Sequence, residues 1–364
     1  MKGRPYGILF GSGNGKVGFS TWRQDLWAKR SERREAMKKY AVFFWVSVAI
    51  SAFCLFLPVE GAAQDKDYPN QAITLIVPWG AGGASDQAAR AVARYAPTYV
   101  GQQMIVVNKP GAGGAVGMET VIRSKSDGYT LLSASIGSNT LTPAFQAGLP
   151  FRFDEVTFIC RTQLNPAVLV VKAEAPWKTL KDLVDDLKKN PGKFMYGTSG
   201  IGSMHNWATY KFLKLAGIDM QNVTMIPFNS GKEQVVAMLG GNIHFSYMNL
   251  SEPLAQLKAG KLKALAVVPK RMEELPNVPS FAEAGYPEVN VLGWRGVSGP
   301  PNLSEGIVKK LEQGLEKLCR DPGWINMVIK MGDLPAYIGP KDFKAFVTKE
   351  YNEAKTDAKS LGIK

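Results

Sequence analysis

The sequence predicts an α/β fold divided between two domains, and three observations support this. From Tyr68 onward, short runs rich in β-branched residues alternate with amphipathic helical patterns. This part of the chain has about 300 residues, which exceeds what one hydrophobic core ordinarily serves. Because no Gly/Ser-rich linker divides it, we expect the chain to cross between domains near Asn165–Val168 and Trp294–Val297. Residues 65–166 and 296–364 would then form one domain, and residues 167–295 the other.

The N-terminal region has the pattern of a secretory signal peptide. In residues 37–63, Lys38 and Lys39 supply a basic start and Ala41–Leu57 an uncharged apolar core, and three small residues precede a cleavage point at Gln64. We therefore expect a cleaved signal peptide, a mature chain that begins near Gln64, and export to the periplasm.

Residues 1–36 have no apolar period that could build a core, and we interpret them as a mis-assigned start upstream of Met37 or as a long leader. Two alternatives remain open for the region. Arg33-Arg34 loosely resembles a twin-arginine export signal. The 17 apolar residues also just reach the ~17–25 that an uncleaved anchor needs to span a bilayer.

Charge and cysteine content limit the classes of function. Without residues 1–63 the net charge falls from +13 to +7, and the remaining basic and acidic residues are interspersed. That distribution does not favour binding to nucleic acid. Cys160 and Cys319 could pair in an oxidising compartment or remain buried free thiols. With only His205 and His244 beside them, we expect no metal site and no cofactor.

Eight segments have the length and composition of buried strands. In chain order they are Ala72–Val77, Met104–Asn108, Tyr129–Ala134, Ala167–Val171, Phe194–Gly197, Val223–Pro227, Ile243–Met248 and Leu262–Val268.

Helices are predicted between these strands. Ser85–Tyr95 is rich in Ala and Arg, and Thr179 with Asp182 forms a capping box for a helix that ends before Pro191-Gly192. Near the C-terminus, Ser304 can cap another helix. The apolar positions expected on the buried faces of the last two helices are Leu180, Leu183, Val184 and Leu187, and Ile307, Val308, Leu311, Leu315 and Leu318.

The first strand runs into a glycine-rich loop, Pro78-Trp79-Gly80-Ala81-Gly82-Gly83-Ala84-Ser85-Asp86, that opens the first helix. Backbone N–H groups at a helix N-terminus have no partner within the helix and favour an anion. The loop lacks the lysine of GxxxxGK[ST] and does not fit GxGxxG. We therefore expect it to seat a carboxylate or a phosphate group and not to take part in phosphate transfer; an ordinary tight turn is the alternative.

A second such loop, Gly197-Thr198-Ser199-Gly200-Ile201-Gly202-Ser203-Met204-His205-Asn206, follows a strand of the other domain. Ligands of open α/β sheets bind at the carboxyl ends of strands, where both loops lie. We therefore predict that the loops close on an anion from opposite sides, through hydroxyl and backbone donors and without a buried Arg or Lys. The same Ser and Thr residues also fit helix N-caps.

The third glycine-rich turn, Asn108-Lys109-Pro110-Gly111-Ala112-Gly113-Gly114, is expected to pack against the first loop. Trp79 and Trp294 fit either core packing or a lid over a ligand. We do not expect an enzyme. The sequence has no GxSxG elbow, His244 falls inside a predicted strand, and no nucleophile is placed beside His205.

Several motifs, in their order along the chain, resemble one family. YPNQAITLIVPWGAGGASDQAAR is followed by VVNKPGAGGAVGMETV, SDGYTLL, KAGKLKALAVVPKRMEELPNVPSFAEAGYP and Trp294-Arg295-Gly296. Over residues 67–364 the chain resembles the Bug family, which comprises the extracytoplasmic solute-binding proteins of tripartite tricarboxylate transporters. It departs from the family pattern at Asn206, where a His is common, and at Trp79, where Phe is usual.

The resemblance implies a two-lobed periplasmic-binding-protein fold, type II-like, with the ligand in the interlobe cleft. It implies a monomeric receptor that captures a small carboxylated organic anion, performs no chemistry and delivers the solute to integral-membrane permease subunits. A sensory subunit, or a periplasmic hydrolase or isomerase, remain the alternatives. The residues expected to bind the ligand are Trp79, Ala81, Gly82, Gly83, Ser85, Asp86, Ser135, Ser138, Thr198, Ser199, Ser203 and His205, with further contacts from the stretch Ser135–Thr140.

Overall fold

The computed structural model describes Arg34, Met37 and residues 67–360. Apart from Met37, the predicted signal peptide lies outside the described residues. Within residues 67–360 the chain forms two mixed sheets with helices packed on them, which confirms the predicted α/β class. None of the described helices is long and apolar enough to span a membrane.

The six-stranded sheet defines the first lobe. Its strands are β1 Ile73–Val77, β2 Met104–Asn108, β3 Thr130–Ser135, β4 Thr157–Asn165, β10 Gly293–Gly299 and β11 Leu334–Ile338. They lie in the order β11-β4-β10-β3-β1-β2. β1 pairs in parallel with β2 and β3, whereas β10 runs antiparallel between β3 and β4.

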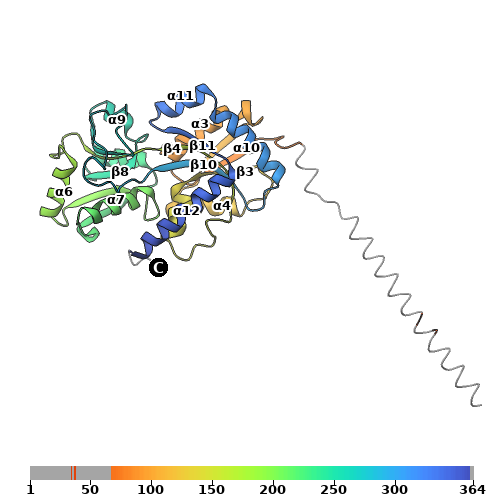
Figure 1. The fold of residues 1–364 in the computed structure, drawn as a ribbon, viewed down its shortest axis with the longest axis horizontal. Helices are drawn as coiled ribbons and strands as arrows, with labels where there is room; N and C mark the ends of the chain where they lie inside the picture. The colour runs from red at the N-terminus through yellow and green to blue at the C-terminus, as the bar shows by residue number, and fades with distance from the viewer. Residues whose placement is uncertain (1–33, 35–36, 38–66, 361–364) are drawn as a thin grey trace, which may run out of the picture. The chain divides into compact units, whose positions relative to one another are not determined.

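The five-stranded sheet defines the second lobe. Its strands are β5 Ala167–Lys172, β6 Phe194–Thr198, β7 Val223–Pro227, β8 Phe245–Asn249 and β9 Leu262–Val268, in the order β7-β6-β8-β5-β9. The chain passes directly from β4 to β5 and returns from β9 to β10. Figure 1 shows the result, with the orange and blue segments together in one lobe and the green and teal segments in the other.

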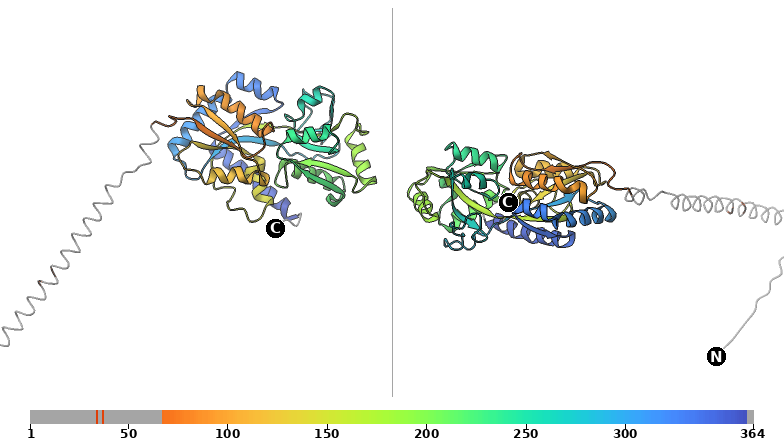
Figure 2. Two further views of the ribbon diagram at one scale, coloured as in Figure 1. Left: turned by 180° about the vertical axis from the view of Figure 1, so that it is seen from behind. Right: turned by 90° about the horizontal axis from the view of Figure 1, so that it is seen from above.

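The helices connect and cover these sheets. Their bounds are α3 Ala84–Tyr99, α4 Ala115–Ile122, α5 Thr142–Phe145, α6 Leu180–Lys189, α7 Met204–Leu215, α8 Gly231–Leu239, α9 Leu254–Lys258, α10 Glu305–Cys319, α11 Pro322–Lys330 and α12 Pro340–Ser360. α12 extends from the first lobe to α7 of the second, as the blue C-terminal helix in Figure 2 shows. There Trp207 Nε1 donates to Asp357 Oδ2 over 3.0 Å.

The predicted helix caps are confirmed. Thr179 and Asp182 form a capping box at the start of α6, and the Ser304 hydroxyl accepts from the N–H of Ile307 at the start of α10. The apolar positions predicted for α6 are all buried, as are those of α10 except for the half-buried Val308. α3 is longer than predicted, and contains Pro97 in its last turn.

All eight predicted strands are present, but β4, β10 and β11 were not predicted. β10 contains three glycines and β11 contains Pro335, and both residue types are depleted in strands. Pairing with β3 and β4 holds β10 in the sheet despite this composition. The placement of His244 inside a strand was wrong: it precedes β8, and its Nδ1 accepts from the backbone N–H of Met195 over 3.0 Å.

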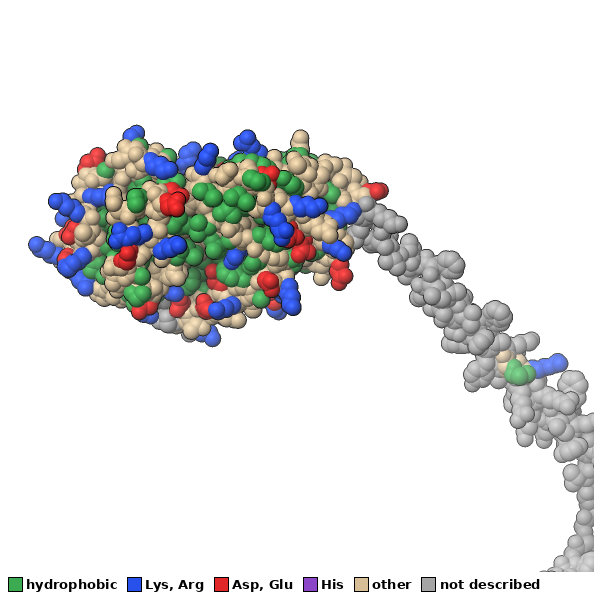
Figure 3. Space-filling view, turned by 45° about the horizontal axis from the view of Figure 1, so that its top comes forward, with side chains coloured by type: hydrophobic (Ala, Val, Ile, Leu, Met, Phe, Trp, Pro, Cys, Tyr) green, Lys and Arg blue, Asp and Glu red, His purple; other side chains and the backbone are tan. Residues whose placement is uncertain are grey.

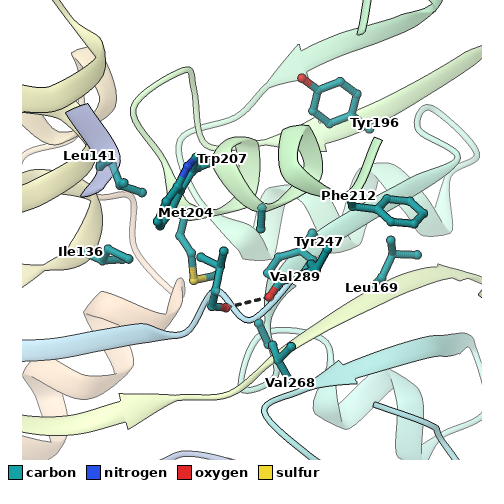
Figure 4. Close-up of a cluster of buried hydrophobic side chains, with 14 of the residues drawn as sticks. Ile136, Leu141, Leu169, Tyr196, Met204, Trp207, Phe212, Tyr247, Val268 and Val289 are labelled. Carbon is teal, nitrogen blue, oxygen red and sulfur yellow. Dashed lines mark hydrogen bonds between the residues drawn. The ribbon is translucent and has the colours of Figure 1, made fainter. Parts of the chain in front are cut away.

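A hydrophobic core extends across both lobes. Figure 4 shows Ile136 and Leu141, which follow β3, facing Met204 and Trp207 on α7. Trp294 is fully buried and packs edge-on against Phe343, so it is a core residue and not a lid. Cys160 and Cys319 are both buried free thiols.

Charged side chains of both signs are mixed over the face of the molecule drawn in Figure 3. Exposed ion pairs between neighbouring residues on the surface, such as Arg320 with Glu316, contribute little to stability. The arrangement agrees with the interspersed charges of the sequence.

Candidate ligand-binding site

A small cavity lies between the two lobes at the carboxyl ends of β1, β3, β6, β7 and β8. Its volume is about 30 Å³, and one water molecule needs ~10–15 Å³ on this measure. The first lobe contributes Trp79, Gly83, Ala84, Ser85, Ser135, Ile136, Gly137 and Arg295, and the second lobe contributes Ser199, Ser203, Met204, His205, Ser230, Gly231, Asn249 and Glu252. The cavity is therefore closed on both sides by polar groups at strand ends.

The N-terminus of α3 faces this cavity. Gly83 is its N-cap, and no side chain within the loop caps the helix. The backbone N–H of Ala84 donates instead to Glu252 Oε1 of the second lobe over 3.2 Å. The Ser85 hydroxyl is buried and has no hydrogen-bond partner among the described residues, so it is available as a donor to a ligand.

Asp86 supports the first loop from behind. Its carboxylate accepts from the N–H of Gly82 over 2.9 Å, from Arg90 Nε over 3.0 Å and from Asn108 Nδ2 over 3.0 Å. Burial raises the pKa of Asp86, but these hydrogen bonds outweigh burial and leave the pKa below its ordinary value. Asn108 also donates to the carbonyl of Trp79, which confirms that the third glycine-rich turn packs against the first loop.

Trp79 is held against the segment that follows β3. Its Nε1 donates to Ser135 Oγ over 3.0 Å, and Ser135 Oγ lies 3.0 Å from Ser138 Oγ. The half-buried indole lines the cavity and therefore retains the predicted position of a lid. Ser138 is fully buried behind Ser135 and does not line the cavity.

The second loop places its hydroxyls in internal hydrogen bonds. Ser203 is the N-cap of α7: its Oγ accepts from the N–H of Asn206 over 3.2 Å and donates to the Gly200 carbonyl over 2.7 Å. Thr198 Oγ1 lies 2.9 Å from Ser203 Oγ, away from the cavity. Because these hydroxyls hold the loop together, Ser199 is the hydroxyl of this loop that is best placed to meet a ligand.

His205 lies in a buried polar network at the floor of the cavity. Gln234 Nε2 lies 3.0 Å from its Nδ1, and Ser246 Oγ lies 2.8 Å from Gln234 Oε1 and 3.0 Å from the Gly197 carbonyl. On the other side of the ring, Nε2 lies 3.3 Å from Glu252 Oε2 and 3.2 Å from Asn249 Nδ2.

Glu252 is the buried acidic group of the cavity, and its side chain is 3% exposed. It accepts from His205, from the N–H of Ala84 and from the N–H of Asn249 over 3.1 Å. Burial alone raises the pKa of Glu252, but His205, the Ala84 N–H and the positive charge of Arg295 lower it below its ordinary value. Glu252 is therefore ionised at neutral pH.

Arg295 contradicts the prediction that the site has no buried basic residue. It lies on β10 directly opposite Ser135 on β3, is 5% exposed and lines the cavity. Its Nη1 donates to the Trp294 carbonyl over 2.7 Å. Sequence reasoning missed it because β10 was not recognised as a strand of the sheet, so nothing placed Arg295 beside the two loops.

The structure brings together seven of the twelve residues predicted to bind the ligand and leaves five outside the cavity lining. The seven are Trp79, Gly83, Ser85, Ser135, Ser199, Ser203 and His205. The five are Ala81, which is exposed, and Gly82, Asp86, Ser138 and Thr198, which build or support the loops.

The main residues that the sequence analysis missed are Ser230, Gly231, Asn249, Glu252 and Arg295. Ser230 and Gly231 follow β7, Asn249 is the last residue of β8, and Glu252 follows it. The rule that was applied to the ends of β1 and β6 would have found them if it had been applied to every strand.

A larger chamber adjoins the cavity and shares Trp79 and Ser199 with it. Its volume is about 490 Å³, within the range of small-molecule sites. Turns of both lobes line it, with Met225, Pro227, Phe228 and Ile201 as apolar members. Residues 67–360 contain no cluster of three His, Cys, Asp or Glu side chains that could hold a metal ion.

Comparison with known proteins identifies the family. Residues 88–363 match the model of the tripartite tricarboxylate transporter family receptor. The chain is 30% identical over 321 residues to the UPF0065 protein in the TAR-I ttuE-ttuC' intergenic region of Agrobacterium vitis, covering 87% of this chain and 89% of that protein.

Two solved structures are also similar. One is a periplasmic transporter, at 32% identity and a TM-score of 0.78, covering 82% of this chain and 99% of that one. The other is an R. palustris protein with adipate, at 25% identity and a TM-score of 0.77, with the same coverage. These findings confirm the two-lobed fold and the resemblance to the Bug family, and the chain belongs to the tripartite tricarboxylate transporter family of receptors.

Proposed function

We propose that this receptor captures a small carboxylated solute between its lobes in the periplasm, as a monomer, and delivers it to membrane permease subunits. One observation carries the proposal: both lobes line a single cavity that contains the N-terminus of α3, the free hydroxyl of Ser85 and the guanidinium of Arg295. Each of these groups favours a carboxylate. The related R. palustris protein with adipate supports the same class of solute.

The cavity and the adjoining chamber suit two different parts of a solute, a polar head group and a larger body. A volume of about 30 Å³ admits only a polar head group beside Ser85 and Arg295. The adjoining chamber of about 490 Å³, with Met225 and Phe228 in its lining, suits a larger and partly apolar body. Trp79 lies against both spaces and would cover the connection between head and body.

The network around His205 also resembles the catalytic triad of a hydrolase. Ser199 Oγ lies 3.4 Å from His205 Nδ1, and Glu252 lies on the other side of the ring. Gln234 Nε2, however, lies closer to Nδ1, at 3.0 Å, and also donates to Ser199 Oγ over 2.9 Å, so Gln234 competes with Ser199 for this side of the imidazole ring. This geometry supports a binding protein over the alternative of a hydrolase.

A screen of carboxylates tests the proposed function. Mono-, di- and tricarboxylates with and without aromatic rings are added to the purified protein, and its melting temperature is followed. A true ligand at 100 times its Kd is expected to add ~2.7 kcal/mol to the free energy of unfolding. The carboxamide of each hit, which has the same shape and no charge, should give no shift. If no carboxylate raised the melting temperature, the receptor proposal would be wrong.

Export is the second part of the proposal, and it depends on the signal-peptide pattern of residues 37–63. We expect the mature protein recovered from a periplasmic fraction to begin at Gln64 or within a few residues of it. N-terminal sequencing of that material measures this directly. Recovery of residues 1–36 at its N-terminus would contradict both the cleavage site and the interpretation of the leader.

A further inference from the structure

Arg295 is a buried cation without an ion-pair partner in the described part of the chain. No carboxylate oxygen of residues 67–360 lies within 4.0 Å of its nitrogens, and its Nε has no hydrogen-bond partner there. Burial lowers the pKa of Arg295, while the more distant Asp333 and Glu252 raise it. A buried charge without a partner is costly, which indicates that an anion from outside the chain completes this site.

Glu252 lines the same cavity and has the opposite charge, and one of its hydrogen-bond acceptor positions is unused by the described residues. A carboxylate offers about four lone-pair positions. Oε2 accepts from both Asn249 and His205, whereas Oε1 accepts only from Ala84 among residues 67–360. One position on Oε1 therefore remains for a donor, and Glu252 lines the cavity from the second lobe while Arg295 lines it from the first.

We propose that Arg295 and Glu252 together select a solute whose carboxylate has a hydrogen-bond donor, a hydroxyl or an ammonium group, on the neighbouring carbon. This inference rests on the proposed receptor function and names its class of substrate. The carboxylate meets Arg295 and the Ser85 hydroxyl, and the donor meets Glu252 Oε1. The small volume of the cavity keeps both groups of the solute close together.

The negative charge of Glu252 disfavours a solute that has a second carboxylate in place of the hydroxyl or ammonium group. That carboxylate would face the ionised Glu252 in a space of about 30 Å³, where like charges repel strongly because little water screens them. An unsubstituted acid would leave the open position of Glu252 without a donor. The site thus discriminates among acids that differ in one substituent only.

Two matched series of acids test this selection by isothermal titration calorimetry. The first has a phenyl body: 3-phenylpropionate, phenyllactate, phenylalanine and benzylmalonate. The second has a butyl body: hexanoate, 2-hydroxyhexanoate, norleucine and butylmalonate. Within each series only the group on carbon 2 changes, from hydrogen to hydroxyl, ammonium or carboxylate, so the hydroxyl and ammonium forms are compared directly.

In the unmodified protein, the hydroxyl or the ammonium member should bind at least ~10-fold more tightly than the hydrogen member, and the second-carboxylate member should bind weakest. Glu252→Gln should remove most of the penalty against the second carboxylate. Arg295→Met should weaken every member at least ~10-fold. Glu350→Gln and Arg161→Met are matched controls, because both residues lie outside the cavity lining, and they should preserve the order.

Several results would overturn the inference. The first is a second-carboxylate member that binds the unmodified protein as tightly as the hydroxyl and ammonium members. The second is an unchanged order in Glu252→Gln, which would limit Glu252 to capping α3. If Glu252→Gln does not fold, the order of affinities measured with the unmodified protein is sufficient to test the inference. If other carboxylates bind and neither series does, only this inference fails; if no carboxylate binds, the receptor function fails.

Discussion

Gly231→Ala is expected to abolish binding of the carboxylate that the screen identifies. Gly231 is the first residue of α8, and a Cβ added there would overlap the carboxylate of Glu252. Glu252 would have to leave the position in which it accepts from Ala84, Asn249 and His205. These contacts hold the lining of the cavity in place, so displacing Glu252 into the cavity is expected to lower affinity by at least ~100-fold, which is the equivalent of one or two hydrogen bonds to a charged group at ~1.5–3 kcal/mol each.

Titration calorimetry of Gly231→Ala beside Gly240→Ala checks this result. Gly240 follows the same helix, has no positive φ, and its added Cβ would approach other atoms no closer than 3.3 Å. That control should bind nearly as well as the unmodified protein. Thermal melting of both variants shows whether each is folded. Full affinity in a folded Gly231→Ala protein would show that Glu252 has no fixed place in the binding site.

Glu350→Gln is expected to stabilise the protein at pH 8 by ~3 kcal/mol and to have little effect at pH 5. Glu350 on α12 is half-buried, and its Oε2 accepts from Trp294 Nε1 over 2.7 Å and from Thr140 Oγ1 over 3.0 Å. Burial raises the pKa of Glu350 from 4.5 to about 7, and these donors and Arg161 lower it only in part.

Glu350 makes the protein less stable as the pH rises, because the folded and unfolded states bind different numbers of protons. Between pH 4.5 and about 7 the folded protein keeps a proton on Glu350 that the unfolded chain releases. The free energy of unfolding therefore falls by ~1.4 kcal/mol per pH unit across that window and reaches its full loss above it. The glutamine amide of the variant does not titrate, so the variant lacks this loss. Asp333, whose pKa burial also raises to about 7, is present in both proteins and cancels in the difference.

Urea unfolding of both proteins at pH 5, 6, 7 and 8 measures this difference. Glu288→Gln is the control, because Glu288 is exposed and its replacement should leave the pH dependence unchanged. Parallel profiles for Glu350→Gln and the unmodified protein would show that Glu350 is ionised in the folded state at neutral pH.

The sequence alone determined the features that depend on local chemistry. The strand patterns, the capping box at Thr179 and the cap at Ser304 each depend on residues within a few positions of one another, and the structure confirms them. The two glycine loops were recognised for the same reason, because each lies between a strand and the helix that follows it. Motif order alone also indicated the family.

Only the tertiary structure showed which charged residues line the binding site. Arg295 and Glu252 come from strand ends that are distant in sequence, and they meet because β10 returns to the first sheet and lies beside β3. No local pattern predicts that pairing, since the glycines of β10 disfavour a strand until two neighbours supply its hydrogen bonds. Likewise, Ser203, Thr198 and Asp86 support the loops because their oxygens form hydrogen bonds with nearby groups of the same loops, and the fold determines which groups those are.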